Sequence, residues 1–310
     1  MRFGYQGILP AMQCPMKENF EIDYEELQRF ANWLISFKGV NGLVTNGHTG
    51  EIFSLSPKER AAVTEAVVEA VDGKVPVVSG IAVEGIKEGI EQAELLKAAG
   101  ADGLLVMPFH HWLRFGFSED HVIEYFTELG ETSGLNLVTH IYPAWTKANY
   151  SSALLGELSK LEWLTTIKLG TREMSQYARD IKAIRENGKG VTILTCHDEY
   201  LLASMVQGVD GALVGFASFI PDKITALYDC VKAGDLKGAQ EIQEWILPLK
   251  EAVYASGEPS GEAHARMKTA MFLSGRLKSD AVRRPIRKPE GVAYQKIESA
   301  VRGAGFSGSR

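Results

Sequence analysis

The chain has 310 residues, of which 45% are hydrophobic, and it carries a formal net charge of −6. This size and apolar content suit one large barrel-type domain, or such a domain with an appendage. The sequence contains no long basic run and no uninterrupted apolar stretch long enough to span a bilayer. We therefore expect neither a nucleic-acid partner nor a membrane partner.

The N-terminus lacks the apolar core of a signal peptide. The three cysteines, Cys14, Cys196 and Cys230, show no metal-ligand spacing and cannot all pair within one chain. Both observations favour a reducing, cytoplasmic setting.

Strand-like and helix-like segments alternate from residue 7 onwards. The segment 39–47 introduces a pattern that recurs at 100–106 and 208–214, in which a glycine-containing junction opens a nearly continuous apolar strand. Such strands are typical of a parallel sheet that is covered on both faces. Three copies of one helix-to-strand junction indicate a repeating βα architecture.

Eight such units can be counted. The predicted strands are 7–12, 39–47, 75–81, 101–108, 136–142, 163–170, 191–197 and 211–219. The predicted helices between them are 24–37, the segment that starts at Ser56, 84–99, 118–132, 151–160, 173–186 and 199–207. This alternation predicts an α/β fold of the (β/α)8 TIM-barrel type over residues 1–220.

Beyond residue 221 the pattern is helical only. The predicted helices are 222–233, 235–255, 261–274 and 291–301. We expect a C-terminal helical extension over residues 221–302. The remaining residues, 303–310, are rich in Gly and Ser and are predicted to be a disordered tail.

One lysine stands inside an apolar strand. Lys168 lies near the end of the predicted sixth strand, where alternation places it on one face with Leu164 and Thr166. An ordinary explanation is a strand-end lysine whose ammonium reaches water. The alternative is a neutral amine that forms a Schiff base with a ketone. Active sites of such barrels lie at the C-terminal ends of the strands, which favours the second explanation.

The end of the predicted fifth strand carries a second candidate. Tyr142 would stand beside Lys168, where its phenol could pass protons to the amine. The alternative is a tyrosine at a strand edge with its hydroxyl in water.

A turn rich in glycine follows the predicted second strand. In Gly47-His48-Thr49-Gly50-Glu51, backbone N–H groups and a hydroxyl can face an anion such as a carboxylate. The alternative is an ordinary loop.

Four histidines also fall near strand ends, namely His48, His110, His140 and His197. They leave open a metal-dependent hydrolase or class II aldolase. Because no tight ligand motif such as H-E-x-x-H is present, we expect no metal. No glycine cluster with basic residues follows the eighth strand, so we expect an unphosphorylated substrate.

Together these motifs make the chain resemble the dihydrodipicolinate synthase / N-acetylneuraminate lyase family of class I lyases. The resemblance extends from residue 7 to about residue 300. It is carried by the turn at residues 47–51, by Tyr142, by Ile167-Lys168 and by the eighth-strand region 211–217. Members of this family are (β/α)8 barrels with a C-terminal helical extension. Many are tetramers, so the resemblance implies a homotetramer or homodimer.

The resemblance also implies roles for individual residues. Lys168 would form a Schiff base with pyruvate or a related 2-oxo acid, without a cofactor. Tyr142 would shuttle protons. Thr49, Gly50 and the neighbouring amides would bind the carboxylate of the 2-oxo acid, and the carbonyl of Leu213 would accept a hydrogen bond beside the catalytic centre.

Departures from the family pattern surround the pocket and not the Schiff-base residues. His48 stands where synthases have a first threonine, and His110 stands in the region of their paired tyrosines. Lys147 has the spacing of an arginine that binds the second substrate, but a lysine does not reproduce a bidentate arginine. Cys196 opens the segment Cys-His-Asp, where synthases have Gly-Asp-Asp. We expect these four residues to line the substrate pocket.

The sequence therefore predicts a class I lyase that acts on a 2-oxo acid as an aldolase or hydro-lyase. Two alternatives stay open: a true dihydrodipicolinate synthase, and a non-catalytic barrel that only binds a 2-oxo acid.

Overall fold

A computed structural model describes residues 4–109, 115–141, 149–188, 190–254 and 261–306. Eight strands form one sheet: β1 (Gly7–Pro10), β2 (Leu43–Thr45), β3 (Val77–Ile81), β4 (Gly103–Val106), β5 (Asn136–Ile141), β6 (Leu164–Leu169), β7 (Thr192–Thr195) and β8 (Gly211–Val214). Their order is β1-β8-β7-β6-β5-β4-β3-β2, and all pairs are parallel. Parallel bridges from Ile8 to Val40 and from Ala11 to Val44 bring the two edge strands together, so the sheet closes into a barrel.

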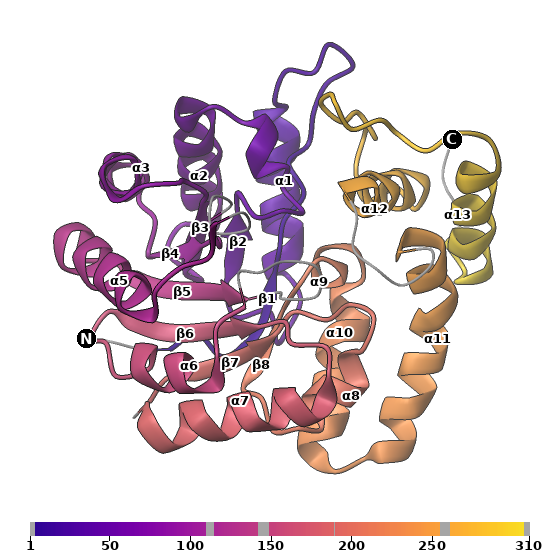
Figure 1. The fold of residues 1–310 in the computed structure, drawn as a ribbon. Coiled ribbons are helices and arrows are strands. Elements are labelled where there is room, and N and C mark those ends of the chain that lie inside the picture. The colour runs from indigo at the N-terminus through magenta and orange to yellow at the C-terminus, as the bar shows by residue number, and fades with distance from the viewer. Residues whose placement is uncertain (1–3, 110–114, 142–148, 189, 255–260, 307–310) are drawn as a thin grey trace.

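Helices surround the barrel. They are α1 (Tyr24–Ile35), α2 (Pro57–Val71), α3 (Ile86–Ala98), α5 (Glu119–Ser133), α6 (Ser152–Leu158), α7 (Met174–Asn187) and α8 (Leu201–Met205), with a 3₁₀ turn, η1 (Ile52–Ser54), before α2. Figure 1 shows this alternation of strands and covering helices. The predicted (β/α)8 architecture is confirmed.

Local sequence signals explain several of these boundaries. Ser56 caps α2: its hydroxyl accepts a hydrogen bond from the amide of Glu59, whose carboxylate accepts one from the amide of Ser56. Asp23 caps α1 by accepting from the amide of Glu26.

The barrel contains a small apolar core of its own. Its members point inward from the strands and are separate from the larger cluster between strands and helices; they are Tyr5, Leu9, Ala11, Val44, Val78, Leu105, Met107, Val138, Leu194 and Leu213. The two clusters account for the nearly continuous apolar strands, because both faces of each strand are buried.

Two details differ from the sequence expectation. The predicted eighth strand, 211–219, ends at Val214, and a short helix, α9 (Phe216–Phe219), follows it. The carboxylate of Asp198 accepts hydrogen bonds from the amides of Gly215 and Phe216 at 3.0 and 2.9 Å, which turns the chain out of the extended conformation. In addition, the register between β5 and β6 shifts at Val138, so Leu164 packs in the outer cluster and does not share the inward face with Lys168.

Four further helices follow β8 and α9. They are α10 (Pro221–Ala233), α11 (Leu236–Tyr254), α12 (Gly261–Leu273) and α13 (Gly291–Gly303). In Figure 1 these orange-to-yellow helices lie together on one side of the barrel. Helix α10 contacts both β1 and α11, so it lies at the junction between the barrel and the expected extension.

The expected disordered tail, 303–310, is described only in part. Helix α13 continues to Gly303, and the ring of Phe306 lies 5.9 Å from that of Phe219 and 6.0 Å from that of Trp245. Residues 307–310 lie outside the described residues.

A buried ion pair joins the extension to the barrel. Lys268 of α12 is fully buried, and its Nζ lies 2.7 Å from Oε1 of Glu51, in the turn after β2. The second oxygen of Glu51 accepts a hydrogen bond from the amide of Arg283 at 3.0 Å. The guanidinium of Arg283 binds Glu59 at the start of α2, and this contact lowers the pKa of Glu59 to about 2. The extension is therefore attached directly to the mouth of the barrel.

In the described ranges, none of the helices combines the length and the apolar character needed to cross a lipid bilayer.

We expect Lys268→Met to lower the free energy of unfolding by about 3–5 kcal/mol, because it leaves the carboxylate of Glu51 buried without its cation. The control is Lys278→Met. The Lys278 side chain is 60% exposed and lies 3.4 Å from Glu26, so its loss should cost less than about 1 kcal/mol. Chemical denaturation measures both; equal losses in the two variants would contradict the prediction.

Candidate active site

A cavity of about 90 Å³ lies at the C-terminal ends of the strands. Its walls come from the segments that follow β1, β2, β6, β7 and β8, from β4, β5, β6 and β8 themselves, and from the C-terminal helices. This volume is well below the roughly 300–1,000 Å³ of sites for drug-sized ligands, so it suits a small molecule. A larger surface groove of about 990 Å³ lies between α11, α12 and α13, away from the strand ends.

Lys168 lies in the wall of this cavity. It is the penultimate residue of β6, pairs with His140 of β5 and Leu194 of β7, and is 9% exposed. Burial lowers the pKa of its ammonium, while Cys196 and Asp198 act in the opposite direction. Because burial disfavours the charged form, the fraction of neutral, nucleophilic amine is increased.

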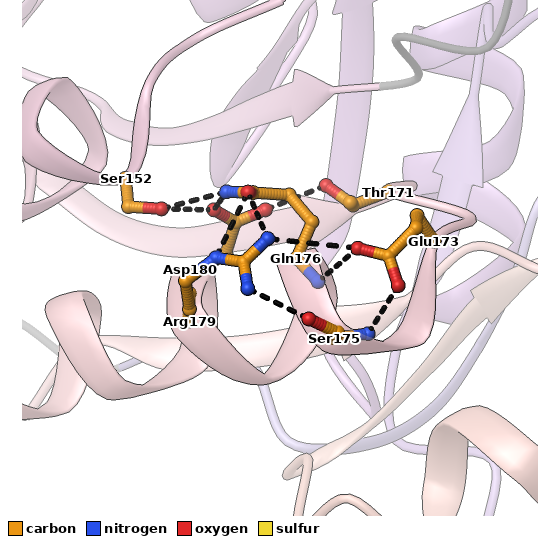
Figure 2. A network of polar contacts seen from close by, with 7 residues as sticks. All are labelled: Ser152, Thr171, Glu173, Ser175, Gln176, Arg179 and Asp180. Atoms are coloured by element: carbon orange, nitrogen blue, oxygen red, sulfur yellow. Dashed lines mark hydrogen bonds and ion pairs between the residues drawn. The ribbon is translucent and has the colours of Figure 1, made fainter.

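A polar network holds the chain that leaves β6. The buried carboxylate of Asp180 in α7 accepts from the hydroxyl of Thr171 at 2.7 Å through one oxygen. Its other oxygen accepts from the hydroxyl of Ser152 at 2.6 Å and from the side-chain amide (Nε2) of Gln176 at 2.7 Å. Figure 2 shows how this carboxylate joins α6, α7 and the segment after β6. The position of the strand end that carries Lys168 is thus fixed from outside the cavity.

The turn at residues 47–51 is closed by its own hydrogen bonds. The amides of Gly50 and Ile52 donate to the carbonyl of Gly47 at 3.1 and 3.2 Å, and the amide of Glu51 donates to that of His48 at 3.0 Å. These three amides are therefore engaged within the turn. Thr49 is buried and lines the cavity, so its hydroxyl and its amide remain the groups to consider for a carboxylate.

Gly50 lies where the turn packs closely against the segment after β1. A Cβ added there would lie 3.0 Å from the carbonyl oxygen of Met12, so a larger residue would displace the backbone of the turn. Gly50 is absent from the residues described as lining the cavity, whereas His48 and Thr49 are present. Its contribution is to allow the turn to lie against the strand end of β1.

The histidines at the strand ends separate into two environments. The ring of His48 lies 5.3 Å from that of His140, and both line the cavity. Burial lowers the pKa of His140 well below its ordinary value, and the charges of Lys168 and His48 act in the same direction. His197 lies instead outside the cavity, with its ring 5.6 Å from Tyr177 and 5.9 Å from Tyr200.

Cys196 and Asp198 lie next to the amine. Both line the cavity with Lys168. Burial raises the pKa of the Cys196 thiol to about 11, so the thiol is protonated near neutral pH. Burial also raises the pKa of Asp198 to about 6, although hydrogen bonds from Tyr254 and from the amides of Phe216 and Gly215 oppose the shift. The hydroxyl of Tyr254 donates to Asp198 at 2.5 Å, which brings α11 to the edge of the site.

The structure adds lining residues that the sequence did not indicate. Arg172 and Glu199 form an ion pair of 2.8 Å in the cavity wall, and His264 of α12 also lines it. A signal for Arg172 exists, because it lies three residues after Leu169, the last residue of the strand that carries Lys168. His264 carries no such signal, because it lies in a helix far from every strand end in the sequence.

The cavity thus brings together five predicted site residues, namely Lys168, His48, Thr49, Cys196 and Leu213. Leu213 lies in β8. Three further predicted site residues, Tyr142, His110 and Lys147, lie outside the described residues. Within the described residues, no group of three or more His, Cys, Asp or Glu side chains is arranged to hold a metal ion.

Comparison with known proteins agrees with this geometry. The model of the Dihydrodipicolinate synthetase family matches residues 4–304. The chain is 30% identical over 303 residues to a 4-hydroxy-tetrahydrodipicolinate synthase of Acidiphilium cryptum, covering 97% of this chain and 99% of that protein. It is 28% identical over 308 residues to an uncharacterized DapA-like lyase of Thermofilum pendens, covering 99% of each.

A solved structure has the same fold as this chain. The dihydrodipicolinate synthase of Bacteroides thetaiotaomicron superposes with a TM-score of 0.87 at 26% identity, over 98% of this chain and 100% of that one.

The buried His197 makes stability depend on pH. Burial lowers its pKa from 6.5 to about 4, so between these values the unfolded chain binds more protons and stability falls as the pH falls. Between pH 7 and pH 5, this imidazole should lower the free energy of unfolding by about 2 kcal/mol. Asp198, whose pKa is raised, instead increases stability as the pH falls below about 6, because the folded chain then binds more protons at this carboxyl than the unfolded chain does. We expect His197→Phe, which keeps a ring between Tyr177 and Tyr200, to remove the His197 contribution.

The measurement is chemical denaturation at pH 7 and at pH 5. The control is His121→Phe on the exposed face of α5, which should keep the wild-type dependence. If His197→Phe loses as much stability at pH 5 as the wild type does, His197 is not held neutral by the fold.

Proposed function

The chain belongs to the dihydrodipicolinate synthetase family of lyases, and we propose that it forms a Schiff base between Lys168 and pyruvate or a related 2-oxo acid. It would act as an aldolase or hydro-lyase on an unphosphorylated substrate. The observation that carries the proposal is the burial of Lys168 in a small cavity at the C-terminal ends of barrel strands.

The chemistry follows from a neutral amine. The nitrogen of Lys168 attacks C2 of the 2-oxo acid, and water leaves as the imine forms. In aldol cleavage, the electron pair of the C3–C4 bond moves to the protonated imine, while the C4 hydroxyl loses its proton and becomes the carbonyl of the released aldehyde. In dehydration, C3 loses a proton, its electron pair moves to the imine, and the C4 hydroxyl then leaves as water. The desolvated surroundings of Lys168 support the first step, because they favour the uncharged amine.

The surroundings of the amine support the orientation of the substrate. Thr49 offers a hydroxyl and an amide to the carboxylate, and Leu213 lines the same cavity from β8, which β1 separates from β2 and the turn that follows it. Tyr142, the residue after β5 in the sequence, is proposed as the group that exchanges protons with the imine, on the resemblance to the family. No cofactor enters this chemistry.

One competing function within the family is the synthase reaction itself, the name carried by the relative from Acidiphilium cryptum. It joins pyruvate to aspartate semialdehyde and must bind a second carboxylate. The arginine expected for that role is replaced by Lys147, so we propose a different second substrate. A barrel that only binds a 2-oxo acid would show reversible binding without turnover.

The setting is also part of the proposal. We propose a cytoplasmic homotetramer or homodimer, in line with the free cysteines Cys14, Cys196 and Cys230 and with the family resemblance.

Reduction with borohydride in the presence of saturating pyruvate should add a stable mass to the peptide that contains Lys168. A panel of 2-oxo acids then ranks the substrates. Lys268 is an internal control, because it is also buried but is engaged with Glu51. Labelling of another lysine, or no labelling, would refute the proposed function.

Replacement of Tyr142 by Phe should lower kcat by about 10²–10⁴-fold, the usual contribution of a positioned acid–base group. Steady-state kinetics on the best substrate of the panel measures this effect. Normal turnover by Tyr142→Phe would show that another group moves the proton.

With pyruvate and aspartate semialdehyde, a coupled assay should detect negligible turnover, because Lys147 cannot bind a carboxylate with the two-pronged geometry of an arginine. The matched variant Lys147→Arg should increase that turnover. A wild-type kcat/KM of about 10⁴ M⁻¹s⁻¹ or more would establish the synthase function instead.

A further inference from the structure

The C-terminal extension places an imidazole in the wall of the active-site cavity. His264 lies in the first turn of α12 and lines the same cavity as Lys168. Its ring is nearly parallel to that of His48, with 6.5 Å between the centroids and 20° between the planes. The carbonyl of His264 accepts a hydrogen bond from the side chain of Gln13 at 3.2 Å, which fixes this turn of the helix against the segment after β1.

The relative position of the two histidines is set by a buried ion pair. His264 and Lys268 are four residues apart on α12, so they share one face of the helix. His48 and Glu51 belong to one hydrogen-bonded turn. Because Lys268 binds Glu51 at 2.7 Å, the contact that joins the extension to the barrel also holds His264 opposite His48.

One ring nitrogen of His264 has no partner in the part of the chain that the structure describes. Its Nδ1 is buried and makes no hydrogen bond there. A buried polar atom without a partner costs free energy, which a ligand group in the cavity would recover.

The imidazole is uncharged near neutral pH. Burial, and then the charge of Lys168, lowers the pKa of His264 to about 4. A neutral imidazole has one donor and one acceptor nitrogen, a combination that matches a hydroxyl group. A carboxylate would be bound better by a cation. The deeper wall of the cavity, with Ala11, Leu105 and Leu213, is apolar and offers no side-chain hydrogen bond.

We propose that His264, together with His48, determines specificity by hydrogen bonding to a hydroxyl on the part of the substrate that lies beyond the 2-oxo acid. The substrate class is then a hydroxylated aldehyde in the direction of aldol addition, or the corresponding polyhydroxy 2-oxo acid in the direction of cleavage. In the direction of addition, the electron pair of the enamine C=C bond forms a bond from C3 to the aldehyde carbon as the π bond of the aldehyde C=O breaks. The aldehyde oxygen takes up the proton that C3 lost when the enamine formed, and water hydrolyses the resulting imine to release the product. This proposal rests on the proposed function, because it requires a substrate held at Lys168.

The test uses two aldehydes of nearly equal size, glycolaldehyde and propanal, each with pyruvate. Glycolaldehyde carries a hydroxyl where propanal carries a methyl group. The wild type should prefer glycolaldehyde in kcat/KM. His264→Phe should lower the ratio of the two kcat/KM values about five- to tenfold, the effect of one lost neutral hydrogen bond. His264→Asn, which retains a donor and an acceptor, should restore part of the ratio, and His121→Phe on α5 should leave it unchanged.

Borohydride trapping of the wild type with pyruvate alone tests the proposed function separately. Absence of trapping refutes the Schiff base, whatever the aldehyde ratio. If pyruvate is trapped but His264→Phe lowers kcat/KM for both aldehydes equally, the role of His264 is structural and the proposal is overturned. Trapping without turnover of either aldehyde overturns it as well.

Discussion

The removal of Lys168 from water is the constraint on which the site depends. The strands are buried on both faces, and the core inside the barrel is apolar, so the ammonium near the end of β6 lies where its charge is poorly solvated. The same environment keeps the imidazole of His140 neutral and the thiol of Cys196 protonated. A desolvated cavity at a barrel mouth thus holds several groups in their uncharged forms, which is the condition that an attacking amine requires.

The C-terminal helices contribute residues to the wall of the cavity. Tyr254 of α11 donates to Asp198, and this carboxylate in turn holds the amides that follow β8. Lys268 of α12 binds Glu51 in the turn that carries Thr49, and His264 of the same helix reaches the cavity. These contacts hold the extension, seen beside the barrel in Figure 1, against the barrel mouth, where Tyr254 and His264 line the cavity.

Much of this arrangement could be predicted from the sequence, since continuous apolar strands and glycine-containing junctions are local signals of a parallel barrel. The strand-end rule then brings Lys168, Thr49 and Cys196 to one cavity. The rest depends on contacts between distant segments. The end of β8 is set by Asp198, and the outward position of Leu164 by a shift of register. No local pattern shows that α12 returns to the barrel mouth with His264.

The desolvation of Lys168 can be tested directly through the pKa of its amine in the folded enzyme. The rate at which Lys168 is reductively alkylated by pyruvate and cyanoborohydride, followed across pH by peptide mass spectrometry, reports the fraction of neutral amine. We expect Lys168 to react with an apparent pKa below the ordinary value of 10.5. An apparent pKa for Lys168 at or above 10.5 would contradict it.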